Sequence, residues 1–515
     1  MNIAQNVERG RRFFPNKTAL IFEEKSWTYK DVDDMANRVA NALRGLGIER
    51  GHRVALFLPN IPEFIISYLG ILKIGAIVVS LNVMLKKNEV KFILDDCSAK
   101  ALITIDSLIE NVPDTELPEL QHILIASGEA KKGISLQQFM LNASPNARAV
   151  EMNRNDPATI IYTSGTTGFP KGATLSHGNV ISNVYAANHC YRTQPEDRLL
   201  LFLPLFHCFG QNAILNAGLN ACATIVLQRR FEPEQVLKTI VTHGVTLFFG
   251  VPTVFIKLLN LNISSDHLSS VRYYFTAAVT MPREVIQRWQ SKHGMVIHEG
   301  YGLTETSPFS TYNHDLKYKL GSIGSPIENV EVKIVNLDGE SVQPGEVGEI
   351  VVRGPNVMLG YWNRPEETAQ VIKNGWFHTG DIGRMDEDGY FYIVDRLKDM
   401  INVSGFKVYP TEVENVIYQH PAVAECAVYG VPDQVKGERV FANILLKTGF
   451  AVTQEEIIAF CSQRIATYKV PHTIKFIDSL PKNATGKVLK RLLQQQELAV
   501  VSQRFEHLSI HALQS

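Results

Sequence analysis

A short glycine-rich loop contains the residue types that could bind a chain of phosphates. It runs Thr163-Ser164-Gly165-Thr166-Thr167-Gly168-Phe169-Pro170-Lys171-Gly172, directly after an apolar stretch (158–162) that predicts a buried strand. Glycines let backbone amides approach an anion closely, and the hydroxyls add further donors. The loop is not a P-loop of the G-x-x-x-x-G-K-[ST] type, because Ala173 stands where the second glycine would be. Since a surface turn could have the same composition, the interpretation depends on the other motifs.

Further segments with charged and aromatic residues follow in a fixed order. They are Glu299-Gly300-Tyr301-Gly302-Leu303-Thr304-Glu305, Trp376-Phe377-His378-Thr379-Gly380-Asp381, Asp395-Arg396-Leu397-Lys398-Asp399 with Val403-Ser404-Gly405-Phe406-Lys407-Val408-Tyr409-Pro410, and Leu480-Pro481-Lys482-Asn483-Ala484-Thr485-Gly486-Lys487. From about residue 5 to about residue 492, the chain resembles the adenylate-forming superfamily of acyl-CoA synthetases, amino-acid adenylation domains and beetle luciferases, and most of all fatty acyl-CoA ligases. The resemblance implies that a carboxylic acid reacts with ATP to give an acyl-adenylate, which is then transferred to a thiol.

Adenylation needs electrostatic help more than a general base. A carboxylic acid with a pKa near ~4.3 is already ionised at neutral pH, but it must approach a polyanion. Cations and donors positioned in advance lower that barrier. The resemblance implies that Lys487 bridges the attacking carboxylate and the α-phosphate, and that Thr304 contacts the α-phosphate. The catalytic residues that it implies are Lys171, His207, Thr304, Glu305 and Lys487.

The resemblance also implies the residues that bind ATP and Mg²⁺. The ring of Tyr301 would stack on adenine, the Asp381 carboxylate would accept hydrogen bonds from the ribose hydroxyls, and Arg396 would contact ribose or phosphate oxygens. Mg²⁺ prefers oxygen ligands, which Glu305 and Thr166 would supply. The full nucleotide set is Thr163, Ser164, Gly165, Thr166, Thr167, Gly168, Lys171, Ala278, Glu299, Gly300, Tyr301, Gly302, Thr304, Asp381, Ile393, Arg396, Lys398, Gly405 and Lys487.

The second half-reaction needs a thiol, from coenzyme A or from the phosphopantetheine of an acyl carrier protein. In the family a small C-terminal domain pivots, so that the catalytic lysine withdraws and another segment approaches to form a tunnel for pantetheine. The resemblance places the pivot at Lys398, the tunnel segment at Gly405 and a residue that admits the thiol at His207.

The pocket for the acid is expected to be mainly apolar. The segment 203–215 has no acidic residue that could pair with the ammonium group of an amino acid. The predicted pocket residues are His207, Phe209, Gly210, Phe249, Val251, Pro252, Ala277, Ala278 and Gly302. We therefore expect a fatty acid of medium or long chain. The alternatives are a fatty acyl-AMP ligase that loads a carrier protein, an aryl-acid CoA ligase or luciferase-like enzyme, and, least favoured, a non-catalytic acyl-binding protein.

The bulk composition excludes several other classes. A net charge of −1 without a dense basic run disfavours nucleic acid as a partner. The six cysteines have no C-x-x-C spacing, which fits a reducing cytoplasm better than a zinc site or a disulfide framework. We expect no signal peptide, since the N-terminus has no apolar core and carries Glu8, Arg9, Arg11 and Arg12. We expect no membrane span, since Lys73 and Asn82 interrupt the longest apolar stretch. The sequence leaves a homodimer open.

The order of the expected elements predicts an α/β fold with at least two domains in 515 residues. Helices at 28–43, 63–73 and 87–95 alternate with strands at 54–58, 76–80 and 101–104, and the alternation resumes from 245 to 299, as in parallel sheets covered on both faces. We expect a large N-terminal domain (1–397) of parallel α/β sheets that includes a β-rich subdomain at about 321–397. A small, mobile α+β domain (398–492) and a tail (493–515) without assigned function follow.

Overall fold

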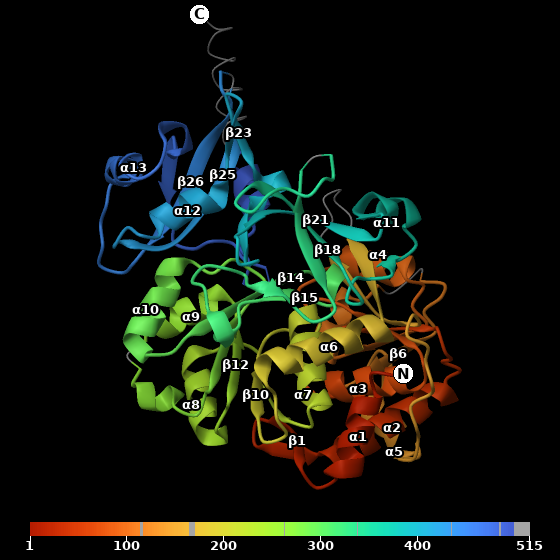
Figure 1. Ribbon diagram of the computed structural model, residues 1–515. Coiled ribbons are helices and arrows are strands. Elements are labelled where there is room, and N and C mark those ends of the chain that lie inside the picture. Colours follow the sequence, from red (N-terminus) through yellow and green to blue (C-terminus); the bar gives the residue numbers. More distant parts are fainter. Residues whose placement is uncertain are drawn as a thin grey trace, which may run out of the picture.

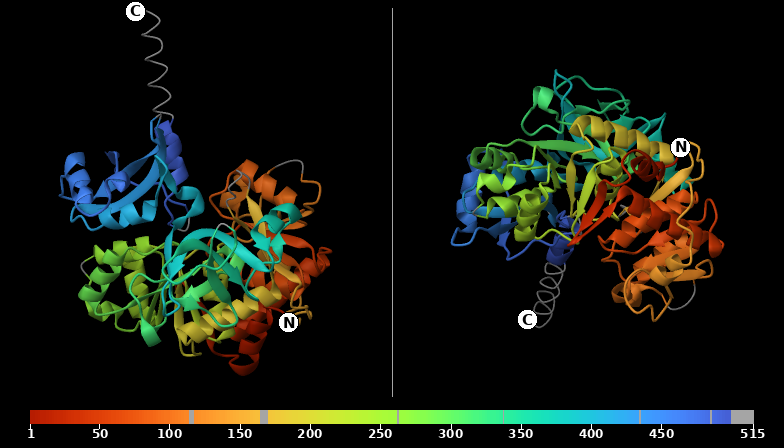
Figure 2. Two further views of the ribbon diagram at one scale, coloured as in Figure 1. Left: turned by 45° about the horizontal axis from the view of Figure 1, so that its top comes forward. Right: turned by 90° about the horizontal axis from the view of Figure 1, so that it is seen from below.

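The structure is a computed structural model that describes residues 1–113, 117–163, 170–261, 263–336, 338–433, 435–483 and 486–498. Within these residues the strands form four sheets. Figure 1 shows the last sheet with α12 and α13 on one side of the molecule, above α9 and α10, while α1 to α3 lie at the opposite end; the views in Figure 2 keep this separation. The predicted α/β class, with large parallel sheets and a smaller C-terminal domain, is confirmed.

The first large sheet is parallel in its middle and antiparallel at its ends. Its strands, in spatial order, are β16 (Ser325–Pro326), β15 (Phe309–Tyr312), β14 (Ile297–Gly302), β13 (Tyr273–Thr276), β12 (Leu247–Gly250), β10 (Arg198–Leu201), β11 (Thr224–Leu227), β1 (Thr18–Phe22) and β2 (Lys25–Thr28). The six neighbouring strands β14, β13, β12, β10, β11 and β1 are parallel to one another. β2, β15 and β16 are antiparallel to their neighbours. The Glu299–Glu305 motif therefore begins on β14, which lies between β13 and β15, and continues past the end of that strand at Gly302.

The second large sheet carries the phosphate-loop motif. Its order is β19 (Gly360–Tyr361), β9 (Lys171–Ser176), β8 (Pro157–Thr163), β4 (Ile77–Ser80), β3 (Arg53–Leu56), β5 (Ala101–Thr104), β6 (His122–Ile125) and β7 (Ile134–Ser135). β8 and β9 are antiparallel and pair Thr163 with Lys171, the two described residues of this ladder that lie nearest the middle of the glycine-rich motif. β19 continues the sheet by pairing with β9, although it is far away in the sequence.

The strands of the two remaining sheets come after nearly all strands of the two large ones in the sequence, the third sheet still within the expected large domain and the fourth within the small one. The third contains β17 (Glu331–Val335), β18 (Val347–Arg353), β21 (Trp376–Met385), β20 (Ile372–Lys373) and β22 (Phe391–Arg396). The fourth contains β24 (Phe406–Val408), β23 (Ile401–Val403), β26 (Gly437–Leu446), β25 (Val423–Asp433) and β27 (Thr473–Phe476). A short 3-10 turn, η6 (Leu397–Asp399), leads from β22 toward β23. The domain boundary expected from the sequence falls in this turn and stays a prediction.

The helices lie between and around these sheets. They are α1 (Gln5–Phe13), α2 (Tyr29–Gly45), α3 (Pro62–Lys73), α4 (Lys87–Asp96), α5 (Leu136–Leu141), α6 (His177–Tyr191), α7 (Ala217–Asn220), α8 (Pro233–His243), α9 (Pro252–Leu259), α10 (Arg283–His293), α11 (Pro365–Val371), α12 (Pro410–Ile417) and α13 (Gln454–Ser462). Short helical turns are η1 (Asp106–Asn111), the π-helical η2 (Phe209–Asn216), η3 (Ser265–Leu268), η4 (Thr304–Thr306), η5 (Asp315–Lys317) and η7 (Thr467–Lys469). Residues 490–498 are helical as well.

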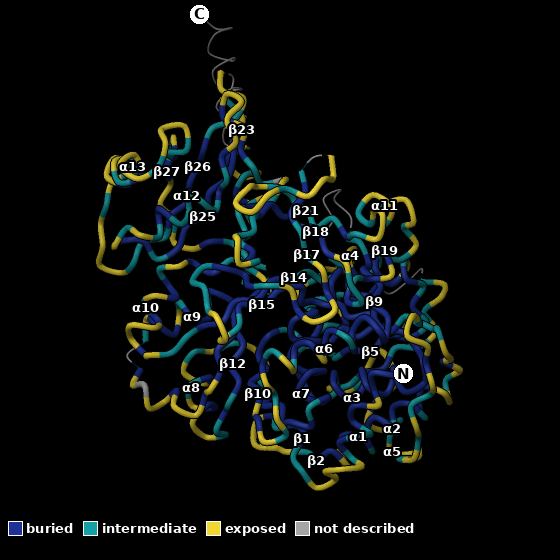
Figure 3. Tube along the Cα trace, in the orientation of Figure 1, coloured by how far each residue is buried: buried dark blue, intermediate teal, exposed yellow. Residues whose placement is uncertain are grey.

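Both faces of the second sheet are buried, as the apolar runs of its strands predict. Along β3, Val54 and Leu56 pack into a core that also includes α2, α3, α6 and the first sheet, while Ala55 packs into a separate core beside α4. Figure 3 shows the buried trace running through the middle of the large domain, with exposed segments at its rim. Side chains that alternate between two cores are what a parallel strand covered on both faces requires.

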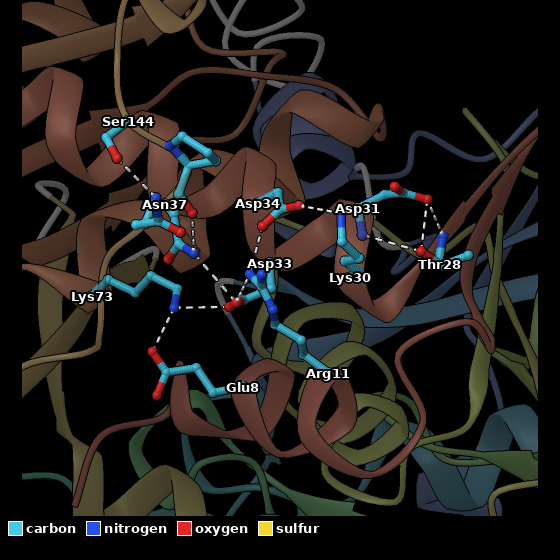
Figure 4. A network of polar contacts seen from close by, with 12 residues as sticks. Glu8, Arg11, Thr28, Lys30, Asp31, Asp33, Asp34, Asn37, Lys73 and Ser144 are labelled. Atoms are coloured by element: carbon cyan, nitrogen blue, oxygen red, sulfur yellow. Dashed lines mark hydrogen bonds and ion pairs between the residues drawn. The ribbon is translucent and has the colours of Figure 1, made fainter.

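A buried ionic network fastens the N-terminal helix to this core. The Nζ of Lys73, on α3, is completely buried and lies 2.6 Å from Glu8 Oε1 on α1 and 2.9 Å from Asp33 Oδ1 on α2. Arg11 contacts both Asp33 and Asp34, at 2.9 and 2.5 Å. Figure 4 shows these side chains converging between the three helices. A buried ammonium needs such partners, because removing it from water is costly.

Candidate functional site

One cavity of about 730 Å³ brings most of the motifs together, and it lies between the large domain and the small one. Its lining comes from all three N-terminal sheets and from the last loop of the small domain. The lining residues are Thr163, Lys171, His207, Phe209, Ala277, Ala278, Gly302, Leu303, Thr304, Glu305, Pro308, Phe309, Glu349, Tyr361, Gln370, Val371, Lys373, Phe377, His378, Thr379, Gly380, Arg396, Leu397, Asn483 and Lys487. All five residues predicted to be catalytic are among them.

Other predicted residues lie elsewhere. Ser164, Gly165, Thr166, Thr167 and Gly168 fall outside the described residues. Gly405 lies in the tight turn between β23 and β24, with a φ of +88°, and Lys398 lies in η6. The remaining predicted residues outside the lining of the cavity are Gly210, Phe249, Val251, Pro252, Glu299, Gly300, Tyr301, Asp381 and Ile393.

The loop that carries Lys487 is held in place by its own backbone and by the large domain. Asn483 accepts a hydrogen bond from the N–H of Lys487 through its side chain (2.9 Å) and donates its own N–H to the carbonyl of Lys487 (2.9 Å). Gly486 has a φ of +81°, and a Cβ there would lie 2.9 Å from Thr253 Oγ1 and 3.2 Å from Val251 Cγ2. The glycine therefore lets residue 486 lie directly against the start of α9. This close contact brings the next residue, Lys487, into the lining of the cavity.

His207 is a neutral imidazole in this cavity. Burial, and to a smaller extent the positive charge of Lys487, lower the pKa of His207 to about 4. Its Nδ1 accepts a hydrogen bond from the N–H of Phe209 (3.2 Å), so the proton is on Nε2. A neutral ring can be moved aside at a lower electrostatic cost than a charged one, which suits a group that admits a thiol.

Glu305 and Lys171 are linked by a tyrosine that the sequence analysis did not single out. The Tyr361 hydroxyl donates to Glu305 Oε1 (2.9 Å), and the Lys171 ammonium lies 5.4 Å from the centre of the Tyr361 ring. Lys171 also forms an ion pair with Glu367 of α11. Burial raises the pKa of Glu305. No local pattern marks Tyr361 or Glu367, because it is the pairing of β19 with β9 that brings Tyr361 into the lining of the cavity and Glu367 against Lys171.

Asp381 and Arg396 pair across adjacent strands at the edge of the cavity. Arg396 Nε lies 2.8 Å from Asp381 Oδ1, and the Tyr301 hydroxyl donates to Asp381 Oδ2 (2.7 Å). The ring of Tyr301 packs among Ile323, Ile334, Ile350 and Phe391, whereas the sequence analysis expected it to stack on adenine. In this structure Tyr301 therefore orients the carboxylate. Since a carboxylate has about four acceptor positions, Asp381 keeps capacity for ribose hydroxyls.

A second carboxylate, Glu349 of β18, supports the turn before Asp381. Glu349 Oε1 accepts from the Gly380 N–H (2.9 Å), and its Oε2 lies 2.7 Å from His378 Nδ1. Gly380 has a φ of +71°, which favours glycine at this turn. The Trp376–Asp381 motif is therefore shaped by a partner on the neighbouring strand, which sequence reasoning missed.

Glu299, at the start of the Glu299–Glu305 motif, is buried below the cavity. Its Oε1 accepts a hydrogen bond from the Met281 N–H (3.0 Å), and burial raises the pKa of Glu299 to about 8. A carboxyl group with this pKa is mostly protonated at neutral pH. The hydrogen bond from Met281 to Glu299 ties β14 to the segment that follows Ala278. Ala278 itself lines the cavity and has a φ of +73°.

The apolar end of the cavity is closed by aromatic rings. Phe209 and Phe309 line it, and Phe275 packs behind them with ring centroids 6.1 and 5.2 Å away. The predicted pocket residue Phe249 is fully buried behind this layer, 6.1 Å from Phe275. Gly302 is required by its surroundings, because a Cβ there would lie 1.6 Å from the carbonyl oxygen of Pro308.

Two negative findings apply to the part of the chain that the structure describes. No helix there is both long enough and apolar enough to cross a membrane. No group of three or more His, Cys, Asp or Glu side chains there could hold a metal ion by itself.

Comparisons with known proteins identify the family of this chain. Residues 7–362 match the family of AMP-binding enzymes, and residues 412–487 match the AMP-binding enzyme C-terminal domain. A long-chain-fatty-acid–CoA ligase of Bacillus subtilis (strain 168) is 38% identical, over 94% of this chain and 92% of the ligase. A feruloyl-CoA synthase of an Amycolatopsis species is 37% identical, over 94% of this chain and 96% of that protein.

A solved structure shares the fold over almost the whole chain. The anthranilate CoA ligase AuaEII in complex with anthranoyl-AMP superposes with a TM-score of 0.92 at 33% identity, over 97% of this chain and 98% of that one. The resemblance that the motifs indicated is confirmed, and the chain belongs to the family of AMP-binding enzymes.

Proposed function

We propose that this protein is an ATP-dependent acyl-CoA synthetase that activates a fatty acid to acyl-AMP and transfers the acyl group to coenzyme A. The observation that carries the proposal is the convergence of two lysines from different domains, Lys171 and Lys487, on one cavity with Thr304 and Glu305. Such a site concentrates positive charge and donors where a carboxylate must meet a polyphosphate.

Each of these residues has a task in the first half-reaction. The carboxylate attacks the α-phosphorus, and the bond from that phosphorus to the bridging oxygen of pyrophosphate breaks. Lys487 neutralises the approaching carboxylate and the α-phosphate, while Lys171 holds the β- and γ-phosphates of the leaving group. Asp381 and Arg396 position the ribose. The chain supplies charge and alignment, so no residue needs to remove a proton.

Mg²⁺ fits the residues present. Glu305, a buried residue that is 8% exposed, lines the cavity. Mg²⁺ is commonly held by one or two carboxylates together with substrate phosphates. Thr166, its other predicted ligand, lies outside the described residues. When bound, the ion would neutralise phosphate charge in the transition state.

In the second half-reaction the thiol replaces AMP on the acyl carbon. We infer that Lys487 withdraws as the small domain turns about η6, and that His207 then moves aside for the thiol. The neutral state of His207 supports this role, since its movement then separates no charge pair. The relatives and the solved structure described above are named for CoA, which favours coenzyme A over a carrier protein as the acceptor.

The nature of the acid follows from the apolar end of the cavity. Phe209, Ala277, Leu303 and Phe309 offer no charged group to a substrate, which suits an alkyl chain. The ring layer around Phe209 and Phe309 also favours a second candidate, an aryl acid, because aromatic rings pack well edge to face. Two of the similar proteins described above are named for aryl acids, a feruloyl-CoA synthase and an anthranilate CoA ligase.

A substrate panel tests the proposal. The purified protein would receive ATP, Mg²⁺ and labelled pyrophosphate with straight-chain acids of increasing length, aryl acids or amino acids. For an alkyl slot, each buried methylene should improve kcat/KM by up to about four-fold, equal to ~0.8 kcal/mol, until the slot is full. A flat profile with a preference for aryl acids would support the second candidate. Exchange with an amino acid alone would refute both. Acylation of a holo-carrier protein but not of CoA would refute the proposed acceptor.

A further inference from the structure

Glu367 of α11 contacts the ammonium group of Lys171, and nothing in the motifs assigns it a role. The two groups form an ion pair, with side chains that are 30% and 15% exposed. Glu367 is not itself part of the lining of the cavity, but Gln370 and Val371 of the same helix are. A carboxylate therefore approaches the phosphate-loop lysine from the side of the cavity formed by α11.

The position of α11 is fixed by contacts outside the nucleotide motifs. Arg364, its N-cap residue, lies 2.8 Å from Asp96 Oδ1 at the end of α4 through its Nη2, and 3.7 Å from Glu367 Oε1 through its Nε. The Tyr162 hydroxyl, on the strand that enters the phosphate loop, donates to the other oxygen of Asp96 (2.6 Å). Glu367 is thus held beside Lys171 by anchored neighbours.

We propose that Glu367 is a positioning residue that competes with the β- and γ-phosphates of ATP for Lys171. The proposal rests on the function proposed above. The ammonium group of Lys171 contacts both the ring of Tyr361 and the carboxylate of Glu367, so it is held at the cavity before it is used. Phosphate oxygens that reach Lys171 meet the negative charge of Glu367 at close range and must displace it.

The exposure of Glu367 makes this exchange feasible. The Glu367 side chain is 30% exposed, although its Oε2 atom, which pairs with Lys171, is itself buried. Rotation of the side chain toward its exposed side would take the carboxylate into water instead of leaving it buried without a partner. The same contact aids the departure of pyrophosphate, since Glu367 can take Lys171 back as the product leaves. Glu367 therefore weakens the binding of substrate and product polyphosphates alike, and leaves the chemistry at the α-phosphorus unchanged.

The test compares Glu367→Gln with Glu366→Gln by titration calorimetry. Glu366 is the matched control, because it is exposed on the same helix and its side chain forms no ion pair among the described residues. The probes are Mg–ATP, Mg–pyrophosphate and AMP, which lacks the β- and γ-phosphates. For Glu367→Gln we expect Mg–ATP and Mg–pyrophosphate to bind about five-fold more tightly, equal to ~1 kcal/mol, with a smaller gain at high salt. AMP should bind as it does to the wild type.

Each outcome has a definite meaning. Unchanged or weaker binding of both polyphosphates to Glu367→Gln would overturn the proposal, and so would an equal gain for AMP or for Glu366→Gln, which would indicate a general effect of charge. If the wild type bound neither ATP nor AMP, the proposed function would fail instead. Thermal unfolding of each variant, with Glu367→Ala as a second substitution, shows whether the fold is intact.

Discussion

Replacing Lys487 by alanine should separate the two half-reactions. Lys487 reaches the cavity from a loop of the small domain that Asn483 and Gly486 hold against the start of α9. The substitution removes one charge from the lining of the cavity. The loop should persist, because its hydrogen bonds to Asn483 use the backbone of residue 487.

The expected loss in adenylation follows from the position of that charge. Removing one positioned group that stabilises charge in a transition state costs about 10²- to 10³-fold in rate, or roughly 3–4 kcal/mol. Lys487 is the smaller of two causes that lower the pKa of His207, so burial should keep the imidazole neutral in the variant. The loss therefore reports the missing ammonium and not a new charge on His207.

The assay measures each half-reaction alone. Exchange of labelled pyrophosphate into ATP measures adenylation, and release of acyl-CoA from prepared acyl-AMP measures thioester formation. The rate of thioester formation should fall by less than about three-fold, because Lys487 has withdrawn from the cavity at that stage. Lys482→Ala is the control, since Lys482 lies in the same loop but pairs with Glu425, 2.5 Å away. Equal losses in both half-reactions of a folded Lys487→Ala variant, or equal effects of the two substitutions, would refute this reasoning.

Three further predictions concern the fold, the pivot and a buried acid. Lys73→Met leaves Asp33 and Glu8 without their shared partner and should lower the free energy of unfolding by about 3 kcal/mol, measured by denaturant titration. The control Lys30→Met breaks only an exposed ion pair and should lower it by less than about 1 kcal/mol. Lys398→Pro restricts the backbone of η6 and should slow thioester formation far more than adenylation; equal effects would place the pivot elsewhere. The raised pKa of Glu299 means that the unfolded chain loses this proton at lower pH than the folded one, so the group increasingly disfavours folding as pH rises from about 4.5 to about 8. Glu299→Gln should remove that part of the pH dependence of Tm, and an unchanged pH profile would contradict the buried acid.

The local elements were predictable because each is specified by nearby residues. The strand at Ala101–Thr104 and the helices α2, α3 and α4 follow from apolar periodicity and lie where the sequence placed them. Periodicity does not say which strands pair, so it could not reveal that the parallel strands divide between two sheets or that β19 joins β9. The π-helical turn η2 was also missed, since the pattern of Phe209–Asn216 resembles any short apolar segment.

The residues of the candidate site also fall into two groups, those that the sequence identifies and those that only the fold reveals. Motif residues such as Lys171, Glu305 and Lys487 were identifiable because their type and order in the chain carry the signal. Glu349 and Glu367 were not, because each acts on a motif residue through a contact between segments distant in sequence. Such partners become visible only when the fold brings distant segments together, as it does for β18 and α11.

The charge arrangement of the cavity links these partners to function. Arg396 pairs with Asp381, and Lys171 pairs with Glu367, so two cations that would contact a nucleotide are each matched by a carboxylate in the same structure. The two carboxylates differ in their surroundings: Asp381 is buried and held by Tyr301, whereas Glu367 is about one-third exposed. A bound nucleotide can therefore add its ribose hydroxyls to Asp381 while the Arg396 pair persists, but its phosphates must replace Glu367. The ribose end would thus be recognised by a fixed pair and the phosphate end by an exchangeable one, which is suited to a reaction that must release pyrophosphate before the nucleotide leaves.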